Sequence, residues 1–129
     1  MAEAATLSVL VVDDERGIRE LVKRCLPDSR FRLAEASGGD EALALVSDPK
    51  ALDLLITDEM MPGMEGHELS RRLRVGNANL RVLYLTGHSD RLFEAKRQLW
   101  RLEAYLDKPF TPDGLREAVA MLMVGRLQF

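Results

Sequence analysis

The hydrophobic pattern of the chain alternates short apolar runs with longer amphipathic stretches. Val, Leu and Ile dominate the short runs, and turn residues or charges bound them, which is typical of β-strands. We predict strands at residues 8–12, 31–36, 52–57, 81–86 and 104–106. The first, third and fourth runs are nearly continuous in apolar residues, which indicates strands covered on both faces.

Between these strands, apolar residues recur at the three- and four-residue spacing of an amphipathic helix. The first stripe ends before Pro27 and consists of Ile18, Leu21, Val22, Cys25 and Leu26. Three further stripes are Ala42, Leu43 and Val46; Leu69 and Leu73, entered through Gly66; and Leu92, Ala95, Leu99 and Leu102. A fifth helix is predicted to begin with Thr111 as N-cap and Pro112 as first helical residue, and to continue through Leu122.

Five strand–helix pairs favour an open, parallel α/β sheet with helices on both faces. The predicted strands recur every roughly 20 to 30 residues, the length of a right-handed strand–helix–strand crossover. Periodicity does not give the strand order, and the flavodoxin-like order 2-1-3-4-5 is the common choice for five strands. We therefore expect a flavodoxin-like (βα)5 fold.

Composition fits one globular domain and narrows its partners. The chain has 129 residues, the length of one domain. Its net charge of −3 argues against a nucleic-acid-binding surface. Its one cysteine, Cys25, excludes an internal disulfide or a cysteine-based zinc site. No apolar run is long enough to span a bilayer, and residues 1–6 lack a signal-peptide pattern. We expect a cytoplasmic protein without membrane contact.

Polar side chains follow the ends of four predicted strands. Carboxyl ends of parallel strands meet at one edge of an open sheet, where ligands of such folds bind. The residues concerned are Asp13 and Asp14 after the first strand, Asp58 after the third, Thr86 after the fourth, and Asp107 and Lys108 after the fifth. A single aspartate after a strand is most often a helix cap or turn residue, so the joint pattern carries the argument.

Three carboxylates at one edge repel one another unless a cation joins them. Oxygen ligands without histidine or cysteine suit a hard ion, and Mg²⁺ fits best. A carboxylate beside a metal ion and a lysine can also attack phosphorus and form an aspartyl phosphate. We expect Asp58 to be this nucleophile, Lys108 to neutralise the phosphoryl oxygens and Thr86 to hydrogen-bond one of them.

Four stretches of the chain resemble the receiver domain of bacterial two-component response regulators. They are VLVVDDE at residues 9–15, DEMMPGMEG at 58–66, LYLTG at 83–87 and YLDKPF at 105–110. The sequence at residues 54–64 and 81–88 is similar to that of receivers fused to the C-terminus of hybrid histidine kinases. We expect residues 1–129 to form a single receiver domain with its core at about 7–125, either stand-alone or a segment of such a kinase.

The resemblance implies roles for the matching residues. Asp58 matches the phosphoacceptor, Lys108 the lysine that contacts the phosphoryl group, and Asp13 and Asp14 the acidic pair that holds Mg²⁺ with Asp58. The backbone carbonyl of Met60 matches a further Mg²⁺ ligand. Thr86 and Tyr105 match the pair that switches on phosphorylation, and the Lys108–Pro109 bond is expected to be cis. The chain departs from the usual pattern at Gly87, where the family often has alanine or serine.

The resemblance also implies the partners. A histidine kinase or a histidine phosphotransfer protein would donate the phosphoryl group. The surface of the fourth helix, fifth strand and fifth helix would then bind a downstream protein or a second copy of the chain. The only chemistry expected is self-phosphorylation and self-dephosphorylation at Asp58, so we do not expect an enzyme with an external substrate.

Two other functions fit the residues less well. A haloacid-dehalogenase-like phosphatase places Asp-x-Asp after its first strand, and residues 13–17 read DDERG instead. A degenerate receiver that acts without phosphorylation is disfavoured by the complete set of Asp13, Asp14, Asp58, Thr86 and Lys108.

The remaining candidate residues favour structural roles. His67 and His88 share no short ligand spacing, and we interpret both as surface residues. Phe93 and Trp100 flank the fourth apolar stripe, where packing is the plainer interpretation and a partner surface the alternative.

Overall fold

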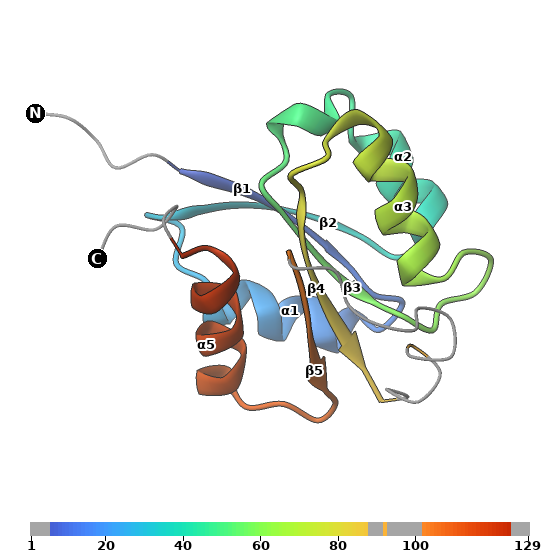
Figure 1. The fold of residues 1–129 in the computed structure, drawn as a ribbon. Coiled ribbons are helices and arrows are strands. Elements are labelled where there is room, and N and C mark those ends of the chain that lie inside the picture. The colour runs from blue at the N-terminus through green and yellow to red at the C-terminus, as the bar shows by residue number, and fades with distance from the viewer. Residues whose placement is uncertain (1–5, 88–91, 93–101, 125–129) are drawn as a thin grey trace, which may run out of the picture.

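The computed structural model describes residues 6–87, 92 and 102–124 (Figure 1). Five parallel strands form one sheet in the order β2-β1-β3-β4-β5. They are β1 (Leu7–Val12), β2 (Phe31–Ala36), β3 (Leu54–Asp58), β4 (Arg81–Thr86) and β5 (Glu103–Asp107). The flavodoxin-like order expected from the strand count is confirmed.

Four α-helices lie in the described part of the chain, and they cover both faces of the sheet. Figure 1 shows α1 (Arg16–Cys25) and α5 (Pro112–Leu122) on one side, and α2 (Gly39–Leu45) and α3 (Gly66–Gly76) on the other. The fourth predicted helix lies outside the described residues apart from Leu92 and Leu102, as do Phe93, Trp100 and His88.

Alternation along the central strands divides the core into two layers. Val9, Val11 and Ile56 pack with residues of α1 and α5, and their neighbours Leu10 and Leu55 pack with residues of α2 and α3. Both sets are buried, because a parallel sheet covered on both faces needs apolar side chains on each. The prediction that strands with continuous apolar runs are covered on both faces is therefore confirmed.

Several predicted strand boundaries were wrong, including the start of β1, which lies one residue earlier at Leu7. The third strand begins at Leu54 rather than Leu52, because Pro49–Ala51 forms a 3₁₀ turn that Leu52 closes. The fifth strand is longer than predicted and begins at Glu103, whose buried carboxylate lies 2.7 Å from Nη1 of Arg74. A charged residue at a strand end hides that end from a hydrophobicity pattern.

The start of α5 agrees with its sequence signal. The hydroxyl of Thr111 accepts a hydrogen bond of 3.0 Å from the backbone N–H of Gly114, and Pro112 occupies the first turn. This cap fixes the chain directly after β5 and so helps to place Lys108 at the edge of the sheet. Among the described residues, no helix is long and apolar enough to cross a membrane.

Candidate functional site

The carboxyl ends of β1, β3 and β5 bring three charged side chains together. Nζ of Lys108 lies 2.9 Å from Oδ2 of Asp13 and 3.3 Å from Oδ2 of Asp58. Oε1 of Glu15 is further away, at 3.9 Å from the same nitrogen. The expected convergence of Asp13, Asp58 and Lys108 is therefore observed.

Backbone contacts hold these side chains in position. The N–H of Lys108 donates to the carbonyl of Thr86 over 2.9 Å, which fastens the turn after β5 to the end of β4. The Lys108–Pro109 peptide bond is cis, as expected. Oδ1 of Asp13 accepts a hydrogen bond of 2.9 Å from the N–H of Glu15, so one oxygen of this carboxylate is used to shape the loop before α1.

Burial and charge act in opposite directions on this cluster. Burial raises the pKa of Asp58, and the neighbouring charge of Asp13 raises it further, whereas Lys108 lowers it. For Lys108 burial disfavours the charged form, but the carboxylates of Asp13 and Asp58 outweigh it and raise the pKa. Lys108 therefore keeps its positive charge at neutral pH, beside a carboxylate that burial makes less stable as an anion.

An open pocket borders this cluster and has the donor set of a hard cation. Its volume is about 210 Å³, and it is lined by Asp14, Glu15, Asp58, Met60, Gly87 and Lys108. Carboxylate oxygens of Asp13, Asp14 and Asp58 lie within 4.8 Å of one another. Three carboxylates of which two are buried leave an excess of negative charge beside one ammonium group, so these residues fit Mg²⁺.

Two predicted switch residues lie apart from the pocket lining. Thr86 ends β4 and is fully buried, and Tyr105 in the middle of β5 is 40% exposed. Tyr105 pairs in register with Tyr84, and Thr86 pairs with Asp107. Thr86 therefore lies at the end of β4, next to the turn that carries Lys108, and Tyr105 lies on β5, which leads into that turn. Neither is among the residues that line the pocket.

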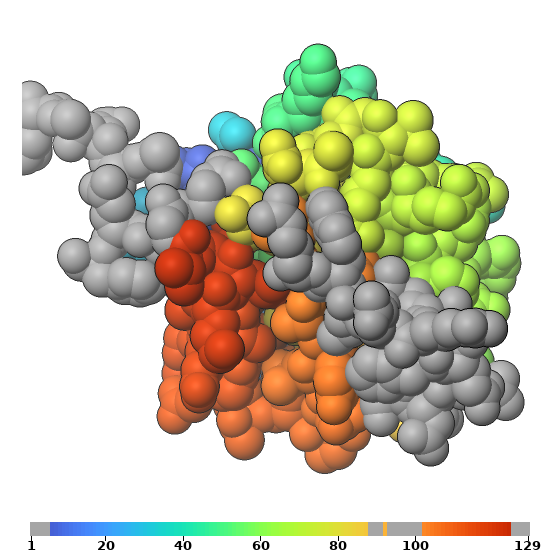
Figure 2. All heavy atoms as spheres, viewed as in Figure 1, coloured from blue at the N-terminus to red at the C-terminus, as the bar shows by residue number. Residues whose placement is uncertain are grey.

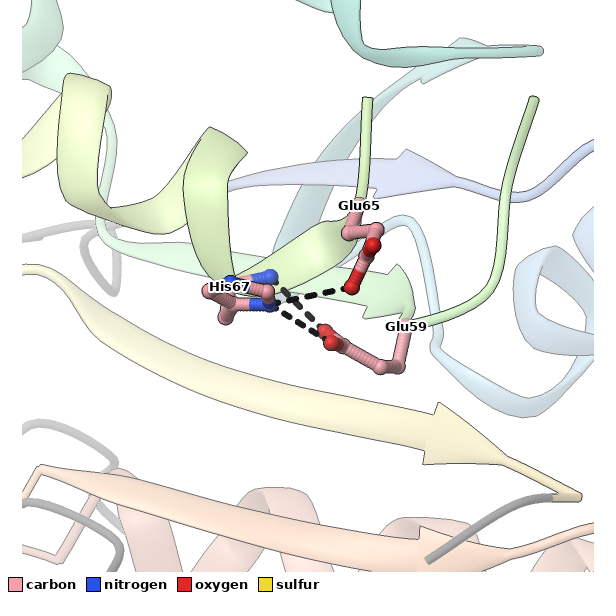
Figure 3. A group of neighbouring side chains, drawn as sticks. All are labelled: Glu59, Glu65 and His67. Atoms are coloured by element: carbon pink, nitrogen blue, oxygen red, sulfur yellow. Dashed lines mark hydrogen bonds and ion pairs between the residues drawn. The ribbon is translucent and has the colours of Figure 1, made fainter. Parts of the chain in front are cut away.

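A second polar cluster, next to the first, was not predicted from the sequence. Glu59 is fully buried, and its Oε2 lies 2.6 Å from Nδ1 of His67 (Figure 3). Burial raises the pKa of Glu59, and His67 opposes this rise. The interpretation of His67 as an ordinary surface residue is wrong, because its side chain is only 29% exposed and pairs with a buried carboxylate.

One glycine allows this second cluster to form. A Cβ atom at Gly66 would lie 2.3 Å from the carbonyl oxygen of Asp58, so only glycine lets the start of α3 approach β3 so closely. The N–H of Gly66 donates to the carbonyl of Glu59 over 2.9 Å. The sequence signal was the glycine itself, although a sequence pattern does not say which side chains it brings together.

The chain is similar in sequence to known proteins of two-component systems. The profile of the response regulator receiver domain family matches residues 9–120. Sporulation initiation phosphotransferase F of Bacillus subtilis (strain 168) is 32% identical over 112 residues, which cover 86% of this chain and 89% of that protein. Sensor protein EvgS of Escherichia coli (strain K12) is 38% identical over 116 residues, which cover 90% of this chain but 10% of that protein.

Solved structures similar to this one include receiver domains and response regulators. The receiver domain from hybrid histidine kinase CckA has a TM-score of 0.74 and 27% identity, and covers 90% of this chain and 98% of its own. Response regulator protein TrrA from Thermotoga maritima, in complex with Mg²⁺-BeF, has a TM-score of 0.72 and 32% identity, with coverage of 91% and 99%.

Proposed function

Because the chain belongs to the response regulator receiver domain family of two-component systems, we propose that it accepts a phosphoryl group on Asp58. The observation that carries this proposal is the position of the Asp58 carboxylate. It borders the open pocket, and one of its oxygens lies 3.3 Å from the ammonium group of Lys108.

Burial and contacts favour Asp58 over its neighbours as the phosphoacceptor. Asp13 is fully buried, and its oxygens contact the N–H of Glu15 and the ammonium group of Lys108. Asp14 is exposed, and exposed carboxylates are poor at excluding water from a phosphoryl group. Asp58 borders the open pocket and lies near the ammonium group of Lys108, and an attacking carboxylate needs both.

The proposed reaction uses the chain's own side chains in fixed places. Bound by Asp13, Asp14, Asp58 and the Met60 carbonyl, Mg²⁺ would supply charge neutralisation for the phosphoryl oxygens. An oxygen of Asp58 attacks phosphorus of a phosphohistidine, the P–N bond breaks, and its electron pair returns to the imidazole. Lys108 binds a phosphoryl oxygen, and water later hydrolyses the acyl phosphate. These two reactions on Asp58 are the only chemistry that we propose.

Phosphorylation is proposed to change the surface of β5 and α5. Thr86 would move toward the phosphoryl group, and Tyr105 would turn inward from its half-exposed position. Figure 2 shows residues of β5 and α5 side by side on one face of the molecule, and these two elements contact each other. This face, with the fourth predicted helix, would bind a downstream protein or a second copy of the chain.

The phosphodonor is proposed to be a histidine kinase or a histidine phosphotransfer protein. The chain spans most of the first relative's length but a tenth of the sensor protein's, so both a stand-alone regulator and a receiver segment of a hybrid kinase stay open. A single receiver domain with its core at about 7–125, and a cytoplasmic location, belong to the same proposal.

Intact-protein mass spectrometry tests the proposal. Incubation with Mg²⁺ and acetyl phosphate should add one phosphoryl group, about 80 Da. Asp58→Asn should abolish the addition, and removal of Mg²⁺ with a chelator should suppress it. Asp40→Asn, an equivalent change at an exposed aspartate of α2, should leave it intact. An adduct that persists in Asp58→Asn would reject Asp58 as the acceptor.

A further inference from the structure

Three possible metal ligands converge where β3 leads into α3. They come from separate positions: Glu59 directly after β3, Glu65 directly before α3, and His67 in its first turn. Their ligand atoms lie within 4.8 Å of one another (Figure 3). We propose that Glu59, Glu65 and His67 form a second metal site, separate from the Mg²⁺ pocket and suited to a divalent ion of the zinc class.

The distances suit a small tetrahedral ion. Nδ1 of His67 lies 3.6 Å from Oε2 of Glu65 and 2.6 Å from Oε2 of Glu59. Tetrahedral bonds of about 2.0 to 2.1 Å separate ligand atoms by about 3.3 Å. The Glu65 distance is near that value. The Glu59 distance suits a shared proton, so an ion that replaces the proton must open this contact by about 0.7 Å.

The donor types select the ion. One imidazole nitrogen with two carboxylate oxygens is a borderline set that zinc accepts, whereas Mg²⁺ prefers oxygen alone. Two ionised carboxylates and a neutral imidazole carry two negative charges, which a divalent ion would neutralise. The chain therefore offers a hard, all-oxygen pocket at Asp58 and a nitrogen-containing cluster at Glu59.

The backbone fixes the buried ligand before any ion arrives. Oε1 of Glu59 accepts a hydrogen bond of 2.8 Å from the N–H of His67, which leaves Oε2 facing the imidazole. Such contacts from outside the metal sphere orient a ligand and strengthen binding. Glu59 is also fully buried, so its anion would gain from a nearby cation.

One side of the cluster is open to solvent. The side chain of Glu65 is 54% exposed and that of His67 is 29% exposed, whereas Glu59 is fully buried. An ion can enter past Glu65, and water can complete its coordination, as in zinc sites with three protein ligands. If Glu59 and His67 only formed a hydrogen-bonded pair, Glu65 would contribute nothing. A change at Glu65 therefore distinguishes a metal site from such a pair.

Isothermal titration of the full chain with Zn²⁺, in excess Mg²⁺ to occupy the acidic pocket, tests the site. One Zn²⁺ should bind per chain. Glu65→Gln and His67→Gln should each weaken binding about tenfold or more. Glu65→Gln changes a half-exposed side chain and should fold normally, which far-UV circular dichroism would verify.

Three controls locate the binding. Glu68→Gln makes the same change on α3, at a carboxylate that faces Arg71 and Arg72, and should leave the affinity unchanged. His88→Gln removes the other imidazole and Asp14→Asn disables the acidic pocket, and both should also leave it unchanged. Binding that survives Glu65→Gln and His67→Gln, binding lost in Asp14→Asn, or no saturable binding up to millimolar Zn²⁺ would each overturn the proposal.

Discussion

Asp58 and Glu59 are neighbours in the sequence, yet they belong to different clusters. Both carboxylates are buried, and burial raises the pKa of each. Asp58 faces Lys108 after β5 and borders an open pocket. Glu59 faces His67 from α3, which supplies both an imidazole and a backbone N–H. The chemistry of each carboxylate is therefore set by the element that packs against it.

The comparison of Asp58 with Glu59 shows that burial alone does not make a carboxylate a nucleophile. Glu59 is as well buried as a nucleophile needs to be, but both of its oxygens contact His67. Asp58 has one oxygen 3.3 Å from the ammonium group of Lys108 and the other 3.3 Å from the N–H of Met60, and it borders an open pocket that a phosphoryl group can enter. A buried carboxylate becomes a nucleophile only where its surroundings leave room and positive charge for the reaction.

The largest expected effect comes from Gly66→Ala, which should disturb both clusters at once. The added Cβ would lie 2.3 Å from the carbonyl oxygen of Asp58, so β3 and α3 must separate. Overpacking of this kind costs about 2 kcal/mol of unfolding free energy, measurable by urea denaturation. Phosphorylation should fall too.

The matched control for this change is Gly17→Ala. A Cβ at Gly17 meets nothing within 4 Å, and the residue lies in the first turn of α1. We expect stability to be unchanged or raised by up to about 1 kcal/mol. If Gly66→Ala behaved like Gly17→Ala, the close approach of α3 to β3 would not be what joins the two clusters.

Asp14→Asn should affect the acidic pocket alone. Loss of one of three carboxylates should weaken Mg²⁺ binding about tenfold, measured by titration of backbone amide NMR signals. Glu59→Gln should change Mg²⁺ affinity by less than about twofold, because Glu59 does not line the pocket. Equal effects of the two changes would mean that the clusters act as one site.

A smaller effect should appear in the pH dependence of phosphorylation. Attack requires an ionised Asp58, and burial raises its pKa above the usual 3.8. The rate with acetyl phosphate should therefore begin to fall at a higher pH than for an exposed aspartate, by about tenfold per pH unit below the folded pKa. Raising Mg²⁺ from a subsaturating to a saturating concentration favours the anion and should move this fall to lower pH. A profile that Mg²⁺ does not move would contradict Asp58 as a ligand.

The same pKa shift fixes the sign of a stability effect. Because the pKa of Asp58 is higher in the folded protein than in the unfolded chain, the folded state binds the proton first. The contribution of Asp58 to stability therefore rises as the pH falls through the folded pKa. Urea denaturation without Mg²⁺ should show this rise in the wild type and a weaker rise in Asp58→Asn.

The acidic pocket could be predicted from the sequence because topology alone places its members. Parallel strands end at one edge, so Asp13, Asp58 and Lys108 had to meet there once the strands were recognised. The pairing of Glu59 with His67 could not be predicted in this way. It depends on how the loop between β3 and α3 folds back, and loop geometry is not encoded in hydrophobic periodicity.

Strand boundaries failed for a related reason. Glu103 begins β5 and is buried, although a charged residue predicts an exposed position. Its carboxylate lies near two partners, Arg74 at 2.7 Å and the hydroxyl of Tyr84 at 3.0 Å, and these come from α3 and β4. Partners that are distant in sequence decide whether a charge can be buried.

The most direct test of the central claim is chemical trapping of the acyl phosphate. Borohydride reduces an aspartyl phosphate to homoserine, and peptide mass spectrometry then locates the altered residue. After incubation with Mg²⁺ and acetyl phosphate, we expect homoserine at residue 58 and an unaltered Glu59. A reduced residue at 13, 14 or 59, with residue 58 intact, would contradict the assignment of Asp58 as the phosphoacceptor.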